Sequence, residues 1–458
     1  MEHSGNHRLT ALRDKLPYFL LIVLCFFPIM RFGMISVAII AFALGCLLCN
    51  YGSFDQYLKR RGWLPFIANV AFFLLLAITL LYSANLKNGL VQLEKGLPFL
   101  VFPLVFLYFP PRIDQKRLQT LFWAFIIANL CFLVYLFQYL VNNASDFAVT
   151  TSPGLILFEG LKDKSLVEQL KSLWNGTFYE ALYYARQTVE NKLYVHKTYA
   201  SQNLLWGVLL GSAMLFSRNT NKYKKSVLIF ILILFAIALV YLFSLTNLFL
   251  IVLLVPILIL LTLKSIQQKM IFVVMVVLVV IATFIKLKSG EPMETYEKGT
   301  YEEYVTYENP QYIIHNLFKM LKNDDRNNIN KCNQNLISES TFFGYGIGDV
   351  QDKLDACYAG LTAKGKQQLD TVNQQLNTHN YYAFLWIAGG IIVLLAFLSL
   401  LIFNGRIAFK NKDYLYLVFI MLVVINMLAE STLSRAHGIL FFVFFNGLLL
   451  HKNLLKSE

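Results

Sequence analysis

Residues 378–403, THNYYAFLWIAGGIIVLLAFLSLLIF, change from polar to apolar within a few positions. The apolar part is long enough to cross the roughly 30 Å of hydrocarbon in a bilayer as one helix, because about 20 residues suffice. It therefore predicts a membrane span that begins next to His379. The stretch from about Arg326 to Gly390 is the polar end of a long segment that interrupts an otherwise apolar chain, and we expect the chemistry of the protein there.

The composition of the whole chain favours a membrane protein. Of its 458 residues, 57% are apolar and 15% are charged, whereas about 25% are charged in a typical soluble protein. The sequence therefore predicts an all-α integral membrane protein. Its net charge of +13 is attributed to basic residues retained at one membrane face, and we expect no binding of nucleic acid.

Apolar stretches predict about twelve transmembrane helices. They fall near residues 17–31, 33–50, 64–82, 97–110, 118–141, 198–217, 226–244, 247–263, 270–286, 381–403, 414–430 and 437–451. The fourth is short and contains Pro98 and Pro103, so we expect it to be kinked, tilted or re-entrant. The resulting divisions are 1–141 with the first five helices, 142–197 as a first loop, 198–286 with the next four helices, 287–380 as a large loop, and 381–458 with the last three.

Basic residues determine the orientation of these helices, because Lys and Arg near the ends of spans stay in the cytoplasm. With both termini inside, the cytoplasmic segments hold half of the 40 Lys and Arg residues. The short outer loops hold Arg31, Lys87, Lys95 and Arg435. Both long loops are therefore predicted to face outward. If that compartment is oxidising, Cys332 and Cys357 of the large loop are able to pair.

His379 stands at the outer start of the tenth predicted helix. Histidine is the side chain that changes its charge near neutral pH, and this property suits a general base. The simpler interpretation is a residue at the start of a helix whose polar atoms are satisfied by water. Its position alone leaves both interpretations open.

Basic residues from several chain segments are expected at the same outer face. Arg326 lies in the large loop, and Arg435 lies in a short polar turn that begins at Glu430. The other candidates are Arg186, His196 and Lys197. Guanidinium groups bind phosphate oxygens bidentately, so this set suits a lipid-linked diphosphate. The alternatives are an ion pair between Arg435 and Glu430, and a solvated loop charge at Arg326.

Motifs for other chemistries are absent from the sequence. It contains no Walker loop, no HExxH and no Asp-x-Asp pair of the kind that holds Mg²⁺ for a nucleotide-sugar donor. Gly344, Gly346, Gly348 and Asp349 form a glycine-rich stretch that follows a polar segment rather than a strand, so they predict a tight turn and no dinucleotide site. We therefore expect no cofactor, no metal and a lipid-activated donor.

Four stretches carry a family resemblance when they are taken together. They are the Arg326 segment, the residues from Phe343 to Gln351, the pair His379-Asn380 followed by Gly390, and the residues from Glu430 to Phe442. This combination resembles the O-antigen ligase and O-antigen polymerase superfamily of bacterial envelope glycosyltransferases. One departure is that members of the superfamily often carry an arginine where this chain reads Ser244-Leu245-Thr246-Asn247.

The resemblance implies transfer of a glycan from undecaprenyl diphosphate to an acceptor hydroxyl at the periplasmic face of the bacterial inner membrane. It implies that His379 is the base and that Arg326 binds the diphosphate, without a metal or a nucleotide. Asn380 is expected to bind substrate. Residues expected to replace the missing arginine are Arg435, Arg186 and Lys197.

Three functions follow from these observations as hypotheses. The first is an O-antigen ligase of lipopolysaccharide biosynthesis, with lipid A core as the acceptor. The second is a polymerase of O-antigen or exopolysaccharide, with a growing glycan as the acceptor. The third is a transporter of polysaccharide or lipid, which requires a binding site near the membrane midplane. Few ionisable residues fall inside the predicted spans, where such a midplane site would need them. The two enzyme hypotheses are therefore favoured over the transporter.

Overall fold

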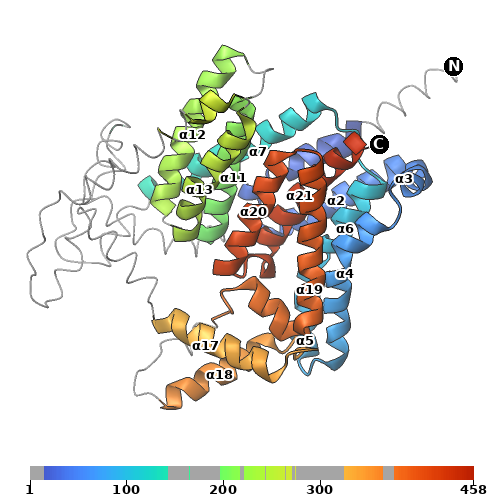
Figure 1. The fold of residues 1–458 in the computed structure, drawn as a ribbon, viewed down its shortest axis with the longest axis vertical. Coiled ribbons are helices and arrows are strands. Elements are labelled where there is room, and N and C mark those ends of the chain that lie inside the picture. The colour runs from blue at the N-terminus through green and yellow to red at the C-terminus, as the bar shows by residue number, and fades with distance from the viewer. Residues whose placement is uncertain are drawn as a thin grey trace, which may run out of the picture. The chain divides into compact units, whose positions relative to one another are not determined.

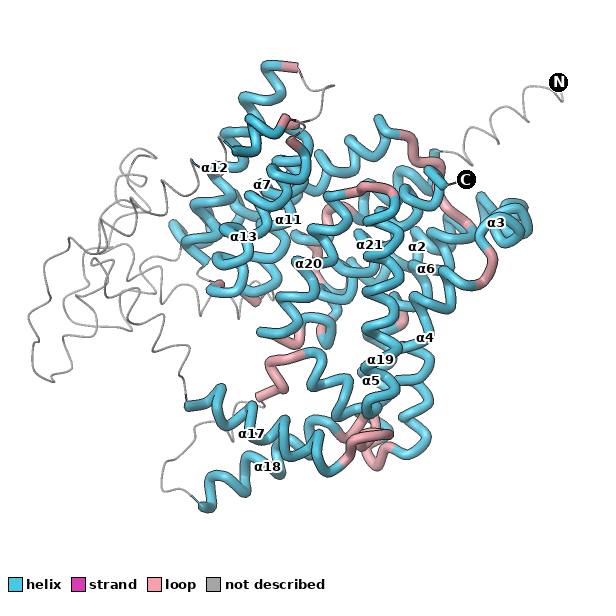
Figure 2. Tube along the Cα trace, viewed as in Figure 1, coloured by secondary structure: helices cyan, strands magenta, loops and turns pink. Residues whose placement is uncertain are grey.

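The computed structural model describes residues 15–142, 165, 196–216, 221–242, 244–263, 265–270, 274, 324–364 and 376–457. All regular secondary structure in these ranges is helical (Figures 1 and 2). The prediction of an all-α fold is therefore confirmed. Contacts divide the chain into two units, one made of Met1–Phe132, Thr198–Leu258 and Asn328–Glu458, the other of Leu133–Lys197 and Ile259–Asn327.

Helices in the N-terminal part follow one another with short connections. They are α2 (Phe32–Asn50), α3 (Phe54–Arg61), α4 (Leu64–Ile78) with η3 (Thr79–Tyr82), α5 (Leu86–Gly96), α6 (Pro98–Tyr108) and α7 (Gln115–Asn142). Pro65 lies in the first turn of α4, where a proline removes no helical hydrogen bond. The predicted span at 64–82 coincides with α4 and η3.

Two further groups of helices complete the described part of the chain. The first group is α11 (Lys197–Leu215), α12 (Lys222–Leu242) and α13 (Leu245–Thr262). The second is α17 (Asp324–Glu339), α18 (Val350–Lys364), α19 (Tyr381–Lys410), α20 (Tyr414–Ala429), η8 (Thr432–Ser434) and α21 (Ala436–Ser457). The predicted span at 270–286 lies outside the described residues except for 270 and 274, as does most of both predicted loops.

Several helices are long and apolar enough to cross a membrane. Within the described ranges there are six: Gly33–Arg61, Leu64–Tyr82, Leu86–Tyr108, Gln115–Gln138, Tyr381–Lys410 and Ala436–Lys456. Shorter apolar helices at Lys15–Leu24, Thr246–Thr262 and Tyr414–Ala429 fall where the sequence predicts three more spans. The chain is therefore an all-α membrane protein.

The fourth span differs from its prediction at 97–110. The structure gives α5 and α6 as neighbouring helices and a candidate span from Leu86 to Tyr108. Asn85 caps α5, because its side chain accepts a hydrogen bond from the backbone N–H of Asn88 at 3.0 Å. The predicted start is too late because Lys87, Glu94 and Lys95 make α5 polar in the sequence.

The core of the first unit is formed around α19, which lies against α4 and α20, while α21 lies against α6 (Figure 1). A buried asparagine cluster made of Asn69, Asn404, Asn446 and Tyr416 joins four of these helices. Asn69 Oδ1 accepts from Asn404 Nδ2 at 2.8 Å and from Asn446 Nδ2 at 3.0 Å. Tyr416 donates to Asn446 Oδ1 at 2.8 Å. Hydrogen bonds between side chains fix the alignment of helices that are otherwise held by apolar contacts.

Candidate functional site

The start of α19 is fixed by Asn380. Its side-chain oxygen accepts hydrogen bonds from the backbone N–H groups of Tyr382 at 2.9 Å and Ala383 at 3.1 Å. This arrangement is an N-cap, which satisfies donors that have no partner in the first turn of a helix. Asn380, the residue after His379, therefore sets the start of the helix at Tyr381.

His379 has a φ of 44°, a left-handed backbone conformation that few residues other than glycine adopt. Its backbone N–H donates to Asn377 Oδ1 at 2.8 Å, and Thr378 Oγ1 donates to Asn380 O at 2.9 Å. Such a conformation costs about 1–3 kcal/mol and persists only where the surroundings hold it. These neighbouring side chains therefore help to hold His379 in its observed orientation.

His379 and Glu430 form the central side-chain pair of the site. The distance from His379 Nδ1 to Glu430 Oε2 is 3.0 Å. Glu430 is the C-cap of α20, so this pair connects the start of α19 to the end of α20. The side chains are 31% and 21% exposed. A carboxylate facing Nδ1 favours the tautomer that carries its proton there, and Nε2 is then the acceptor.

Two further hydrogen bonds tie the start of α19 to α20 and the turn after it. Thr378 Oγ1 and Ser431 Oγ, both buried, lie 2.6 Å apart. Tyr382 donates its hydroxyl proton to Val424 O at 3.1 Å. The positions of His379 and Glu430 are therefore fixed by contacts on both sides of the pair.

Helix α19 is interrupted at Gly389 and Gly390. Their φ and ψ angles are −135° and 16° for Gly389 and 68° and −170° for Gly390. A Cβ atom at Gly390 would lie 1.9 Å from Phe342 O, so only glycine fits at this position. The backbone N–H of Ile391 donates to Thr341 O at 2.9 Å. The loop carbonyl of Thr341 thus accepts the hydrogen bond that a carbonyl of the preceding helical turn would accept in an uninterrupted helix.

The glycine turn, residues 344–349, packs against this interruption. Gly344 and Gly346 have φ values of 70° and 100°, which glycine adopts without steric cost. The backbone N–H of Tyr345 donates to Ile387 O at 2.8 Å, and that of Gly346 donates to Ala388 O at 2.9 Å. The turn therefore satisfies carbonyls that the interrupted helix leaves without helical partners.

The other side of the glycine turn binds the segment before α5. Asp349 accepts hydrogen bonds from the backbone N–H groups of Ala84 at 2.8 Å and Asn85 at 2.7 Å. Asn88 Nδ2 donates to Gly348 O at 2.8 Å. A carboxylate that accepts two backbone N–H groups makes strong, charge-assisted bonds. The large loop is thereby attached to the N-terminal helices as well as to α19.

Tyr345 makes a polar contact at the edge of this turn. Its hydroxyl donates to Glu339 Oε2 at 2.7 Å. Burial, and then the hydrogen bond to Glu339, raise the pKa of Tyr345 to about 12. The phenol therefore remains protonated and able to donate throughout the neutral range.

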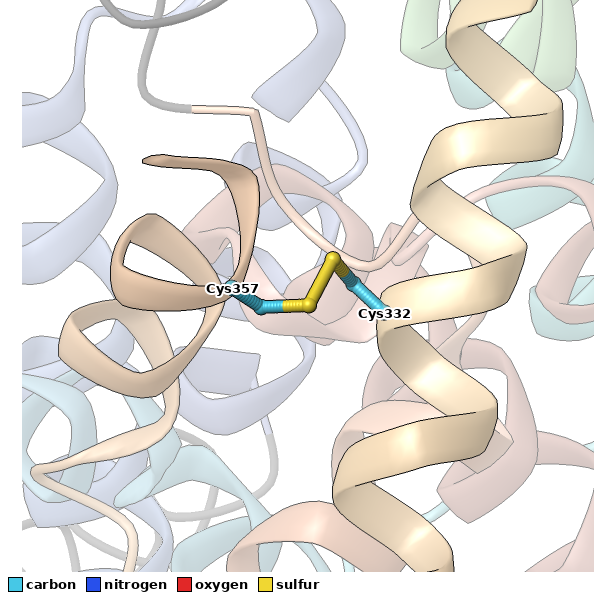
Figure 3. The surroundings of a disulfide bond; sticks show 2 residues. All are labelled: Cys332 and Cys357. Atoms are coloured by element: carbon cyan, nitrogen blue, oxygen red, sulfur yellow. A yellow bond between two sulfur atoms is a disulfide. The ribbon is translucent and has the colours of Figure 1, made fainter. Parts of the chain in front are cut away.

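A disulfide between Cys332 and Cys357 joins α17 to α18 (Figure 3). Cys332 is fully buried, and the two Cα atoms are 5.8 Å apart. The pairing that the sequence left open is therefore present in the structure. It connects the helices that precede and follow the glycine turn.

Residues 229–398 match a protein family described as O-antigen ligase. The matched segment contains the glycine turn, His379, Asn380 and the interruption of α19. The resemblance to the O-antigen ligase and polymerase superfamily is confirmed. No curated protein matches the chain. The family consists of enzymes of the glycosyltransferase type, and it implies a lipid-linked glycan as the substrate.

The residues that match the family model, 229–398, do not include Glu430, and the sequence did not indicate the pairing of Glu430 with His379. The two residues are 51 positions apart, which hides the contact, and Arg435 is a basic partner closer to Glu430 in sequence. One feature of the sequence could have indicated that Glu430 has a partner. Glu430 lies at the end of an apolar helix, and charges at membrane depth are costly and are usually paired.

The basic residues predicted for the diphosphate lie in different parts of the structure. Arg435 is exposed between η8 and α21, within the first unit. Arg326 is exposed in the first turn of α17, while His196 and Lys197 are half-buried at the start of α11, and all three belong to the second unit. Arg186 lies outside the described residues. All contacts given above for His379 lie within the first unit, so a diphosphate site made of these residues remains a prediction.

Asn247, in the stretch where superfamily members often carry an arginine, is buried among neutral groups. Asn247 Nδ2 donates to Ser244 Oγ at 3.0 Å and to Thr198 O at 3.3 Å. Its Oδ1 accepts from Asn426 Nδ2 at 3.2 Å. Asn426 lies one turn before Glu430, whose backbone N–H donates to Asn426 O at 2.9 Å. In this chain, the hydrogen bond between the side chains of Asn247 and Asn426 therefore lies one helical turn before Glu430.

Metal ligands do not gather in the part of the chain that the structure describes. There, no three His, Cys, Asp or Glu side chains stand close enough to hold a metal ion. The pair of His379 and Glu430 places a carboxylate 3.0 Å from an imidazole nitrogen.

Proposed function

We propose that this protein is an O-antigen ligase that transfers a glycan from undecaprenyl diphosphate to a hydroxyl of lipid A core at the periplasmic face of the inner membrane. The observation that carries the proposal is the contact between His379 and Glu430 beside the capped start of α19. The family match of residues 229–398 supports the class of reaction. Within this class, the acceptor and the donor lipid are our assignment.

In the proposed mechanism His379 is the general base. The Glu430 carboxylate accepts a hydrogen bond from Nδ1–H, so Nε2 is free to take the proton of the acceptor hydroxyl, and the carboxylate stabilises the imidazolium that forms. The resulting nucleophilic oxygen attacks the anomeric carbon of the donor glycan while the bond from that carbon to the diphosphate oxygen breaks. Attack from the side opposite the diphosphate inverts the anomeric configuration. Undecaprenyl diphosphate leaves with the bonding electrons.

Arginine side chains stabilise the leaving diphosphate in this proposal. Arg435 is exposed in the short connection that also contains Glu430, and Arg326 is the second candidate. Guanidinium groups are planar, permanently charged donors that match phosphate oxygens, and they stabilise negative charge without a metal. Arg186, His196, Lys197 and Asn380 are further proposed substrate-binding residues.

The decisive experiment is transfer by the purified protein in nanodiscs. Undecaprenyl-diphosphate glycan is supplied with either lipid A core or a second donor molecule as the acceptor. Glycosylated lipid A core is expected, and its formation should persist in EDTA. Replacing His379 with Ala should abolish transfer while leaving membrane insertion and donor binding intact, because only the proton acceptor is removed.

Other outcomes would contradict specific parts of the proposal. Longer chains on undecaprenyl diphosphate, with no product on lipid A core, would identify a polymerase. Strong inhibition by EDTA would contradict metal independence. Movement of labelled donor across vesicles without any transfer would identify a transporter. Full activity of His379→Ala would exclude His379 as the base.

A further inference from the structure

The segment just before α19, residues 376–380, is held by two helices of the large loop. Asn333 of α17 is buried, and its Nδ2 donates to Thr378 O at 2.9 Å. Gln351 of α18 donates from Nε2 to Leu376 O at 3.1 Å. Two backbone carbonyls of the segment that ends in His379 and Asn380 therefore have side-chain partners from outside it.

The disulfide connects the two helices that supply these donors. Cys332 is adjacent to Asn333 in α17, and Cys357 lies in α18 together with Gln351. Because the bond is covalent, it tethers α17 to α18 next to Asn333 and within two turns of Gln351. Asn333, Gln351 and the disulfide are called the loop clamp below.

His379 depends on such support because its backbone conformation is unfavourable. A non-glycine residue at a φ of 44° relaxes to a negative φ when its neighbours release it. That rotation would reorient the imidazole relative to Glu430, since the next residue is fixed as the cap of α19. The loop clamp holds the backbone carbonyls of Leu376 and Thr378, which lie directly before His379.

We propose that Asn333 and Gln351, locked together by the Cys332–Cys357 disulfide, are positioning residues for His379. The proposal rests on the proposed function, because it takes His379 to be the base. The loop clamp touches neither the base itself nor Glu430 in the contacts above. It acts by keeping the imidazole in the orientation that proton transfer requires.

The test compares clamp variants with matched controls in the same transfer assay. The clamp variants are Asn333→Ala, Asn333→Asp, Gln351→Ala and the double variant Cys332→Ala with Cys357→Ala. The controls are Asn335→Ala, on the exposed face of α17, and Cys131→Ala, an exposed free cysteine. Disulfide formation, from peptide mapping without reductant, and the thermal midpoint report whether each variant folds.

We expect kcat to fall about ten- to a hundredfold in each clamp variant while KM for the donor stays within about twofold, because small displacements of a catalytic group reduce rate more than binding. Asn333→Asp should be as slow as Asn333→Ala, since aspartate keeps the shape but lacks the donor. Both controls should retain wild-type kcat.

The results separate this proposal from the proposed function. Wild-type kcat in Asn333→Ala and Gln351→Ala, together with an inactive His379→Ala, would overturn the clamp and leave the base in place. An active His379→Ala would overturn both. An equal loss of kcat in Asn335→Ala would show general destabilisation and overturn the clamp. If the double cysteine variant does not accumulate, the Asn333 and Gln351 variants decide, because they keep the disulfide.

Discussion

At the scale of single residues, the site depends on a histidine that is followed by a helix cap and faced by a carboxylate. The sequence indicates His379 and Asn380, because a polar pair directly before an apolar helix marks the membrane surface. It does not indicate Glu430 as the partner, because that contact forms only when α19 and α20 pack together. Local patterns predict which residue types are available, and tertiary packing determines which of them meet.

Glu430→Gln tests the carboxylate. Glutamine preserves the volume of the side chain, but it has no charge to stabilise the imidazolium formed when His379 takes a proton. We expect kcat to fall about a hundredfold, at the lower end of the range for a general base, with donor affinity nearly unchanged. The same exchange at exposed Glu339, which accepts from Tyr345, is the matched control. Unchanged kcat in Glu430→Gln would remove the carboxylate from the mechanism.

Arg435→Ala tests the binding of the diphosphate. Removing a guanidinium that contacts phosphate oxygens should weaken donor binding about tenfold or more, because hydrogen bonds between charged groups are stronger than neutral ones. Arg435→Lys should restore only part of the affinity, since an ammonium cannot bind bidentately. Arg406, exposed near the far end of α19, provides the control. Titration with labelled donor measures the effect, and equal affinity in all three variants would limit Arg435 to a structural role.

At the scale of elements, the long apolar helices were predictable and their interruptions were not. The predicted span at 64–82 coincides with α4 and η3, because apolar residues fill that stretch. The sequence contained Gly389-Gly390, but it did not reveal that loop backbone would supply hydrogen bonds to a broken α19. That arrangement requires the glycine turn, about 40 positions earlier in the chain, to approach within contact distance.

Gly390→Ala should destabilise the fold. At a φ of 68° a new Cβ would meet Phe342 O at 1.9 Å, so strain adds to a steric clash. We expect a loss of more than about 3 kcal/mol, seen as a lower thermal midpoint in detergent. Gly405→Ala in the same helix is the control, since its Cβ would meet nothing within 4 Å, and alanine is favoured in helices by about 1 kcal/mol. A thermal midpoint equal to wild type in Gly390→Ala would contradict the observed packing.

At the scale of the whole molecule, the distribution of basic residues predicts the orientation in the membrane. α21 has 22 residues and is about 33 Å long at 1.5 Å per residue, which matches the hydrocarbon thickness of a bilayer. We therefore expect Arg435 and Lys456 to lie at opposite membrane faces. The bias of basic residues predicts that Lys456 is cytoplasmic.

Cysteine labelling tests this orientation. Glu339→Cys and Lys456→Cys are both at exposed positions, and the four free cysteines are replaced by alanine while the disulfide stays. A membrane-impermeant maleimide should label position 339 in cells with a permeabilised outer membrane, and position 456 only after the inner membrane is opened. The reverse order of labelling would invert the predicted topology.

The interruption of α19 has a consequence for how the protein enters the membrane. Ile387 O, Ala388 O and the N–H of Ile391 bond to residues 341–346 of the loop, and each would be costly if it were left unpaired in hydrocarbon. A ribosome makes residues 341–346 before α19, and in the predicted topology these residues belong to a loop that crosses the membrane. In that topology we expect insertion of α19 in its native form to require translocation of the preceding loop, because only the loop supplies these hydrogen-bond partners.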